Sequence, residues 1–154
     1  MSVDRAILFA GDSTLLNPAP IAKDWILEGS PVTRNKLLSV SNDKVASTWI
    51  WDCTAGRFNW FYDIDETVYV IEGSVTVRDH HGATRTLMSG DIAFFPAGSS
   101  AEWTVKEYVR KLAFLRQPLS PYVMLLQRVC NKLNRMTRIQ PAKIEAASTF
   151  SLSS

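Results

Sequence analysis

The stretch NWFYDIDETVYVIEGSV, residues 59–75, decides how the chain folds. Aromatic and β-branched residues recur along it, as they do in strands that pack one side against a core. Six residues separate Glu66 from Gly73, and Trp60 and Tyr62 precede this pair. The stretch holds no histidine, so aromatic rings and carboxylates are the functional side chains that it offers.

The chain around this stretch continues in the same way from residue 36 to residue 116. Short segments rich in β-branched and aromatic residues alternate with turn sequences such as SNDK, DHHG, SGD and PAGSS. This rhythm predicts an all-β domain, either an antiparallel sandwich or a barrel.

The N-terminal region, residues 1–35, lacks that rhythm. Pro18, Pro20 and Pro31 interrupt any long element there, which predicts an arm with one short strand near residues 25–27.

The C-terminal region predicts a helix. Ser120 and Pro121 provide an N-cap and a proline at the first helical position. Apolar residues then recur every three or four positions, at Tyr122, Leu125, Leu126, Val129, Leu133 and Met136. We therefore expect three parts, which are an N-terminal arm (1–35), a barrel (36–116) and an amphipathic helix with a tail (117–154).

Composition limits the class of protein. The chain has 154 residues, of which 46% are hydrophobic and 21% charged, and these values argue against disorder. No apolar run approaches the ~20 residues of a membrane span, and the first residues do not resemble a secretory signal. Cys53 and Cys130 are too few for a disulfide framework, so we expect a cytoplasmic protein.

Charge is distributed unevenly along the chain. Residues 1–115 hold 11 lysines and arginines against 14 acidic residues, whereas residues 116–154 hold 6 against 1. The helix is therefore a basic appendage on a mildly acidic body. We expect a homodimer, because an exposed sheet face and a long arm are liabilities for a monomer. We expect no nucleic acid and no membrane surface among the partners.

Two segments resemble the sequence motifs of the cupin superfamily. WFYDIDETVYVIEG (60–73) is similar to the first cupin motif, and GDIAFFPAGSSA (90–101) is similar to the second. Gly90, Pro96 and Gly98 fit the second motif, and sixteen residues separate the two segments. The resemblance implies a single cupin (jelly-roll) β-barrel, and the residues outside the motifs add an N-terminal arm and one C-terminal helix to this all-β fold.

The resemblance is closer to one metal-poor subgroup, which includes ureidoglycine aminohydrolase and the ethanolamine-utilisation cupin. The matching positions are Trp51, Cys53, Gly56, Phe58, Glu66, Tyr69, Gly73, Trp103 and Lys111. Members of the subgroup differ in chemistry, but they act on nitrogen-containing metabolites, and the resemblance implies such a ligand here.

The metal site of the superfamily is missing from this sequence. Metal-binding cupins use three histidines and a glutamate, and the corresponding positions here are Trp60, Tyr62, Glu66 and Ala101. One carboxylate does not complete the coordination shell of a transition metal, so we expect no metal and no cofactor. His80 and His81 lie in a predicted turn away from these positions.

The ligand positions would instead form an aromatic box around Glu66. By strand alternation Trp49 and Trp51 share one face of their strand, as do Ala101 and Trp103 of theirs. We expect the ligand-binding residues Trp49, Trp51, Trp60, Trp103 and Lys111, with Glu66 as a base and Tyr62 as an acid.

Two alternatives stay open at the level of sequence. The tryptophans could fill the barrel as core, with Glu66 in a structural ion pair with Lys111. The chain could also be a non-catalytic scaffold or interaction module that binds partners through its basic helix. The first hypothesis is a metal-free cupin that binds a small metabolite in an aromatic pocket, and whether it catalyses a reaction is left open.

Overall fold

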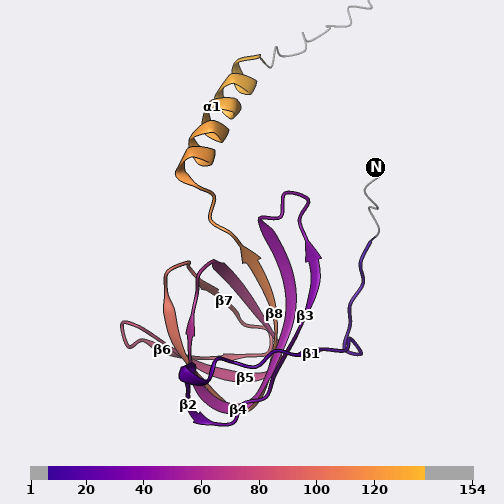
Figure 1. Cartoon of the computed structure of the whole chain (residues 1–154), viewed down its shortest axis with the longest axis vertical. Helices are drawn as coiled ribbons and strands as arrows, with labels where there is room; N and C mark the ends of the chain where they lie inside the picture. Colours follow the sequence, from indigo (N-terminus) through magenta and orange to yellow (C-terminus); the bar gives the residue numbers. More distant parts are fainter. Residues whose placement is uncertain (1–6, 138–154) are drawn as a thin grey trace, which may run out of the picture. The chain divides into compact units, whose positions relative to one another are not determined.

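The computed structural model describes residues 7–137, and it is almost entirely β-structure apart from one α-helix (Figure 1). The strands are β1 (Asn17–Pro18), β2 (Ile26–Gly29), β3 (Thr33–Val40), β4 (Ala46–Phe61), β5 (Asp65–Asp79), β6 (Thr84–Met88), β7 (Ile92–Phe95) and β8 (Ser100–Arg116). A short 3₁₀ turn, η1 (Lys23–Trp25), precedes β2, and the helix α1 spans Pro121–Thr137. The predicted all-β fold with one C-terminal α-helix is confirmed for this part of the chain.

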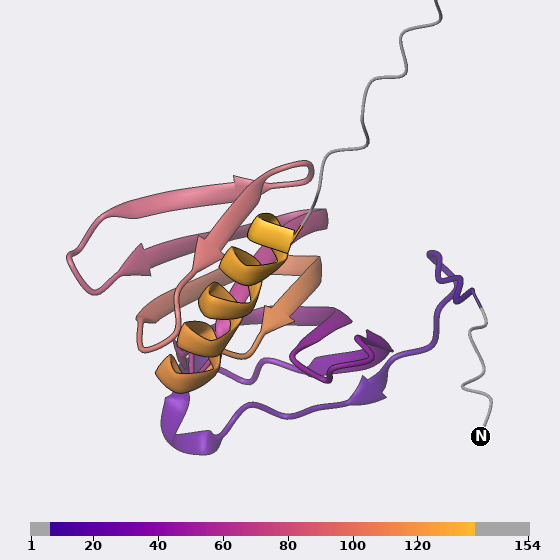
Figure 2. The same cartoon turned by 90° about the horizontal axis from the view of Figure 1, so that it is seen from above.

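All strands join one antiparallel sheet in the order β1-β3-β4-β8-β5-β6, with β2 paired to β4 and β7 paired to β5. The central strand is β8, which pairs with β4 on one side and β5 on the other along nearly its whole length. Figure 2 shows the same strands from above, curving around a common interior.

Three strands, β4, β5 and β8, are longer than the short segments that the sequence predicts. β5 continues through Gly73, and β8 continues through Tyr108. Register shifts between Thr54 and Gly56 in β4, and around Gly73 in β5, let each strand bend without ending. The sheet therefore folds over on itself.

Gly73 is essential to this bend. Its φ of 72° lies in the left-handed region, and a Cβ atom there would lie 2.1 Å from the carbonyl oxygen of Tyr108. Only glycine allows β5 and β8 to approach so closely at the bend.

The core lies between the two halves of the folded sheet. Alternate residues of β8 are buried, among them Ala101, Trp103, Val109 and Ala113. Trp51 near the start of β4 contacts Phe58 near its end, with ring centroids 6.4 Å apart. The two halves of one strand thus face each other across the interior.

The chain divides into two compact units, Met1–Pro118 and Leu119–Ser154. The first unit contains the whole sheet. In the second, α1 begins at Pro121, and Val123 N–H donates to the Ser120 Oγ atom at 3.4 Å. Within residues 7–137, no helix is long and apolar enough to cross a membrane.

Candidate functional site

A cavity of about 370 Å³ opens on the inner side of the sheet. Its walls come from the arm and from β3, β4, β5 and β8. The lining residues are Ala19, Pro20, Asn35, Trp49, Trp51, Trp60, Glu66, Lys111, Ala113 and Leu115. Five of the seven residues predicted from the sequence for this site, namely Trp49, Trp51, Trp60, Glu66 and Lys111, line the cavity.

Glu66 and Lys111 form a buried ion pair at the floor of the cavity. The Lys111 Nζ atom lies 2.6 Å from the Glu66 Oε1 atom, and the two side chains are 4% and 8% exposed. Glu66 pairs with Leu115 and Val70 with Lys111, so the two charged residues share the inner face but lie four positions apart along the strands. Their long side chains close that gap. A carboxylate and an ammonium buried this deeply each need the other, since an unpaired buried charge is costly.

Indole rings surround the Lys111 ammonium. Its Nζ atom lies 4.6 Å from the ring centroid of Trp103, 4.8 Å from that of Trp51 and 5.7 Å from that of Trp60. Cation–π contacts of this kind contribute about 0.5–2 kcal/mol each, more when water is excluded. Three of the four tryptophans predicted for the aromatic box thus surround one charged group, and that group is the ammonium of Lys111 rather than Glu66.

Tyr62 and Trp103 do not line the cavity, although the Trp103 ring is one of the three around the Lys111 ammonium. Trp103 Nε1–H donates to the Tyr62 hydroxyl oxygen at 2.9 Å, and the Tyr62 ring stacks on Phe95 with centroids 4.6 Å apart. Burial, and next the nearby Glu66 charge, raise the pKa of Tyr62 well above its ordinary value. Tyr62 thus stays a neutral phenol in the folded protein.

Cys53 is fully buried beside the same cluster. Its Sγ atom donates to the Thr54 carbonyl oxygen, and burial raises its pKa to about 12. A thiol in this state is a poor nucleophile, because the thiolate is the reactive form. Cys53 therefore acts as a small core residue.

The residues at the superfamily's metal positions do not fit a transition metal. They are Trp60, Tyr62, Glu66 and Ala101, and Glu66 is already neutralised by the Lys111 ammonium. His80 and His81 are exposed in the turn between β5 and β6. In the part of the chain from residue 7 to residue 137, no three His, Cys, Asp or Glu side chains lie close enough to hold an ion.

The two alternatives for Glu66 are not exclusive. It pairs with Lys111, as the structural interpretation expects, and it also lines an open cavity, as the ligand interpretation expects. Arg57, which lies outside the lining, pairs with Glu28 and Glu102.

Sequence reasoning missed Asn35, whose amide is a further polar group in the lining. It pairs with Trp51 in the ladder between β3 and β4, so it points to the same side of the sheet. Strand alternation along β3 shows which residues share a face with Asn35. The sequence does not show, however, that β3 lies next to β4, so it could not place Asn35 beside Trp51.

Similar proteins are known from sequence. A model of the EutQ-like cupin domain matches residues 40–113. Acetate kinase EutQ of Salmonella typhimurium is 42% identical over 55 residues, which are 36% of this chain and 24% of that protein. The chain therefore spans only about a quarter of the length of this curated relative.

Solved structures give the same picture. Ethanolamine utilization protein Q of Salmonella typhimurium LT2 is 28% identical with a TM-score of 0.50, over 55% of this chain and 69% of that one. A protein of unknown function from Pseudomonas syringae is 27% identical with a TM-score of 0.62, over 67% and 45%. Together with the bent antiparallel sheet, these matches show that the chain has the fold of the cupin superfamily and is similar to the ethanolamine-utilisation cupin.

Proposed function

We propose that the protein binds a small, planar, nitrogen-containing metabolite in the cavity beside Glu66 and Lys111. The observation that carries this proposal is an open volume of about 370 Å³ lined by three tryptophans and one buried ion pair. Cavities of ~300–1,000 Å³ with apolar walls and a few convergent polar groups are typical of small-molecule sites. The similarity to ethanolamine utilization protein Q agrees with a nitrogen-containing ligand.

The lining suits a flat ligand with hydrogen-bonding edges. Trp49, Trp51 and Trp60 offer rings for stacking, and the Asn35 amide offers both a donor and an acceptor. Glu66 and Lys111 add an acceptor and a donor side by side. This pair could exchange a proton with the ligand, and it supports acid–base chemistry at Glu66 and Lys111 better than at Tyr62, which lies outside the lining.

Calorimetric titration of the full chain tests the proposal. The probes are flat lactams and ureas such as hydantoin and uracil, alongside apolar rings of the same size. We expect saturable binding of at least one nitrogen-containing probe, weakened roughly 10–100-fold by Asn35→Ala or Trp49→Ala, as expected for the loss of one good contact. Arg57→Gln, outside the cavity, is the control. Binding that persists unchanged in both cavity variants would place the ligand elsewhere.

A second candidate function is a partner-binding module based on α1. Tyr122, Leu125 and Val129 on its apolar side are exposed, and Arg128 and Lys132 make it basic. No acidic residue occurs between residues 116 and 144. These features favour an acidic, grooved protein surface as the partner.

Photo-crosslinking in living cells separates this second function from the first. A photoreactive residue at Val129 lies on the apolar side of α1, and one at Asn131 lies on the opposite side. We expect a discrete heterologous product from position 129 that is absent from position 131. Equal products at both positions, or a product containing only this chain, would contradict the second candidate.

We also propose a cytoplasmic location. Cys53 and Cys130 are both free thiols, and a reducing compartment keeps exposed thiols such as Cys130 in that state.

A further inference from the structure

The surroundings of Lys111 Nζ have the composition of a receptor for an amine. Three indole rings lie within 5.7 Å of the nitrogen, and a carboxylate oxygen lies 2.6 Å away. Proteins that bind free alkylammonium ions use this combination of aromatic faces and negative charge. Here the ammonium is the side-chain group of Lys111, which lies on β8.

We propose that this cage is an ammonium-binding site that the chain fills with its own lysine, so that the cavity beside it accepts only uncharged ligands. A second cation entering the cavity would meet the Lys111 charge, while the Glu66 carboxylate is already neutralised. This inference rests on the proposed function in one respect, because both concern ligands of the same cavity. It predicts that the cavity binds uncharged amides and excludes charged amines.

Removing the lysine head group should open the cage to solutes. Lys111 itself lines the cavity, so the space left by Lys111→Ala joins the existing volume. The atoms removed correspond closely to n-propylammonium, which can enter from the cavity and replace them. The uncharged 1-propanol has nearly the same shape and serves as the matched probe.

Thermal melts of full-length Lys111→Ala test this assignment. We expect n-propylammonium chloride to raise the melting temperature of Lys111→Ala saturably by several degrees, above the effect of sodium chloride at equal ionic strength. 1-Propanol should give no rise. The wild type should not respond, because its site is occupied, and Lys111→Ala with Glu66→Gln should lose the response with the carboxylate.

The inference would be overturned if n-propylammonium did not raise the melting temperature of folded Lys111→Ala, or if it raised that of the wild type by the same amount. If Lys111→Ala does not fold alone, refolding with n-propylammonium but not with 1-propanol is the supporting readout, and failure with both overturns it. The test uses no natural ligand, so it stands apart from the titrations with lactams and ureas.

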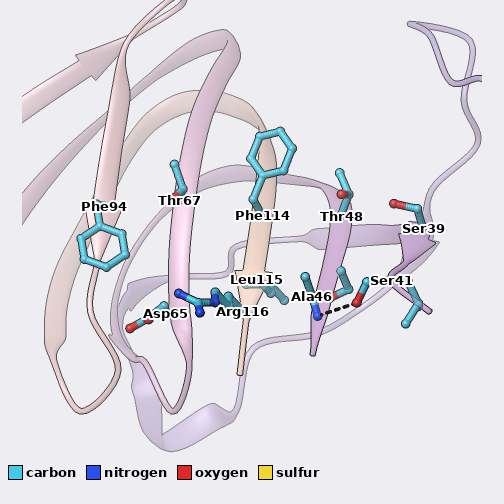
Figure 3. A pocket seen from close by; sticks show the side chains of 12 residues that line it. Ser39, Ser41, Ala46, Thr48, Asp65, Thr67, Phe94, Phe114, Leu115 and Arg116 are labelled. Carbon is cyan, nitrogen blue, oxygen red and sulfur yellow. Dashed lines mark hydrogen bonds between the residues drawn. The ribbon is translucent and has the colours of Figure 1, made fainter. Parts of the chain in front are cut away.

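The outer face of the sheet carries a second, independent feature. Tyr69, Ile92, Phe94 and Phe114 are exposed there, since each alternates with a residue that points inward. Phe114 and Phe94 both pair with Thr67, and Figure 3 shows the two rings on either side of it. Phe94, Thr67 and Phe114 line part of a hollow of about 570 Å³.

The N-terminal segment borders the same face. Leu8 and Phe9, which are 66% and 91% exposed, line a second groove of about 780 Å³ whose other wall includes Tyr69 and Leu112. Both the sheet face and the segment next to it thus present apolar surface without cover, as interaction surfaces do.

Charges at the two ends of this face point to a second copy of the chain as the occupant. Arg110 on β8 pairs in register with Glu72 on β5, and Arg116 on β8 pairs with Asp65 on β5. A two-fold axis along the face between β5 and β8 places each β8 cation opposite the partner copy's β5 anion at both ends. The sequence already predicts a homodimer, and we infer that this face is its interface, with the N-terminal segments between the two sheets.

Light scattering of the full chain with charge-reversed variants tests the interface. We expect twice the mass of one chain for the wild type and for the control Leu27→Glu, which lies on β2. Phe114→Glu and Arg110→Glu should shift the protein toward monomer, and Glu72→Arg added to Arg110→Glu should restore the dimer. A monomeric wild type, or a dimer unaffected by Phe114→Glu, would overturn the inference.

Discussion

At the scale of single residues, the ion pair between Glu66 and Lys111 determines how the site responds to mutation. Both groups are buried, and each neutralises the other at 2.6 Å. Their mutual dependence makes the pair stable only as a unit, because removing one partner leaves a buried charge without compensation.

Glu66→Gln should therefore lower stability by about 3–5 kcal/mol, since it leaves the Lys111 ammonium in the core without a counter-charge. Denaturant titration of the full chain measures this loss. Glu28→Gln, which removes a carboxylate from an exposed pair with Arg57, is the matched control and should change stability little. A loss of similar size in both variants would mean that the buried pair has no special role.

Cys53 gives the protein a defined response to alkaline pH. Its folded pKa of about 12 lies above the ordinary value of 9.0, so its contribution to stability is complete below pH 9 and is lost as pH rises toward 12. The expected slope is about 1.4 kcal/mol per pH unit, and Tyr62 adds in the same direction above its ordinary pKa.

Unfolding free energies between pH 8 and pH 10 check this response. Cys53→Ala should flatten the decrease above pH 9, while Cys130→Ala, at an exposed thiol, should leave it unchanged. An identical slope in the wild type and in Cys53→Ala would contradict the assignment to Cys53.

At the scale of secondary-structure elements, two glycines with positive φ offer a matched comparison. Gly73 has φ 72° and faces the Tyr108 carbonyl, whereas Gly90 has φ 94° with no atom near the position of a Cβ. Gly90→Ala should cost about 1–2 kcal/mol from backbone conformation alone. Gly73→Ala should cost clearly more, because β5 and β8 must also separate. Equal losses in denaturant titrations would show that the close approach is not important.

The same elements show what sequence can and cannot provide. Alternation along Trp49 and Trp51, and along Ala101 and Trp103, was enough to predict which side chains point inward, because a strand repeats every two residues. The sequence could not show that segments on both sides of Gly73 form one bent strand, since a glycine signals a turn and a bulge equally well. It also could not place Tyr62 behind the cavity, because that depends on the Phe95 ring stacked against it.

At the scale of the whole molecule, the buried core residues found within residues 7–137 all lie in the first unit. Its buried residues run from Ile21 to Ala113. A chain that ends at Pro118 should therefore keep a single cooperative thermal transition and bind the same small ligands as the full chain. A broad, non-cooperative melt of that truncated chain would show that α1 or the tail contributes to the core.

The position of β8 in the sheet also has a consequence for how the protein is made. β8 is the last strand of the sheet in chain order, yet it lies between β4 and β5 and pairs with both. During synthesis, β4 and β5 leave the ribosome long before the strand that joins them, so their edges stay open until residue 116 has emerged. The Glu66 carboxylate likewise has no Lys111 ammonium to pair with until Lys111, 45 residues later in the chain, has been synthesised. The interval between β5 and β8 is therefore the period in which a nascent chain is most exposed to aggregation.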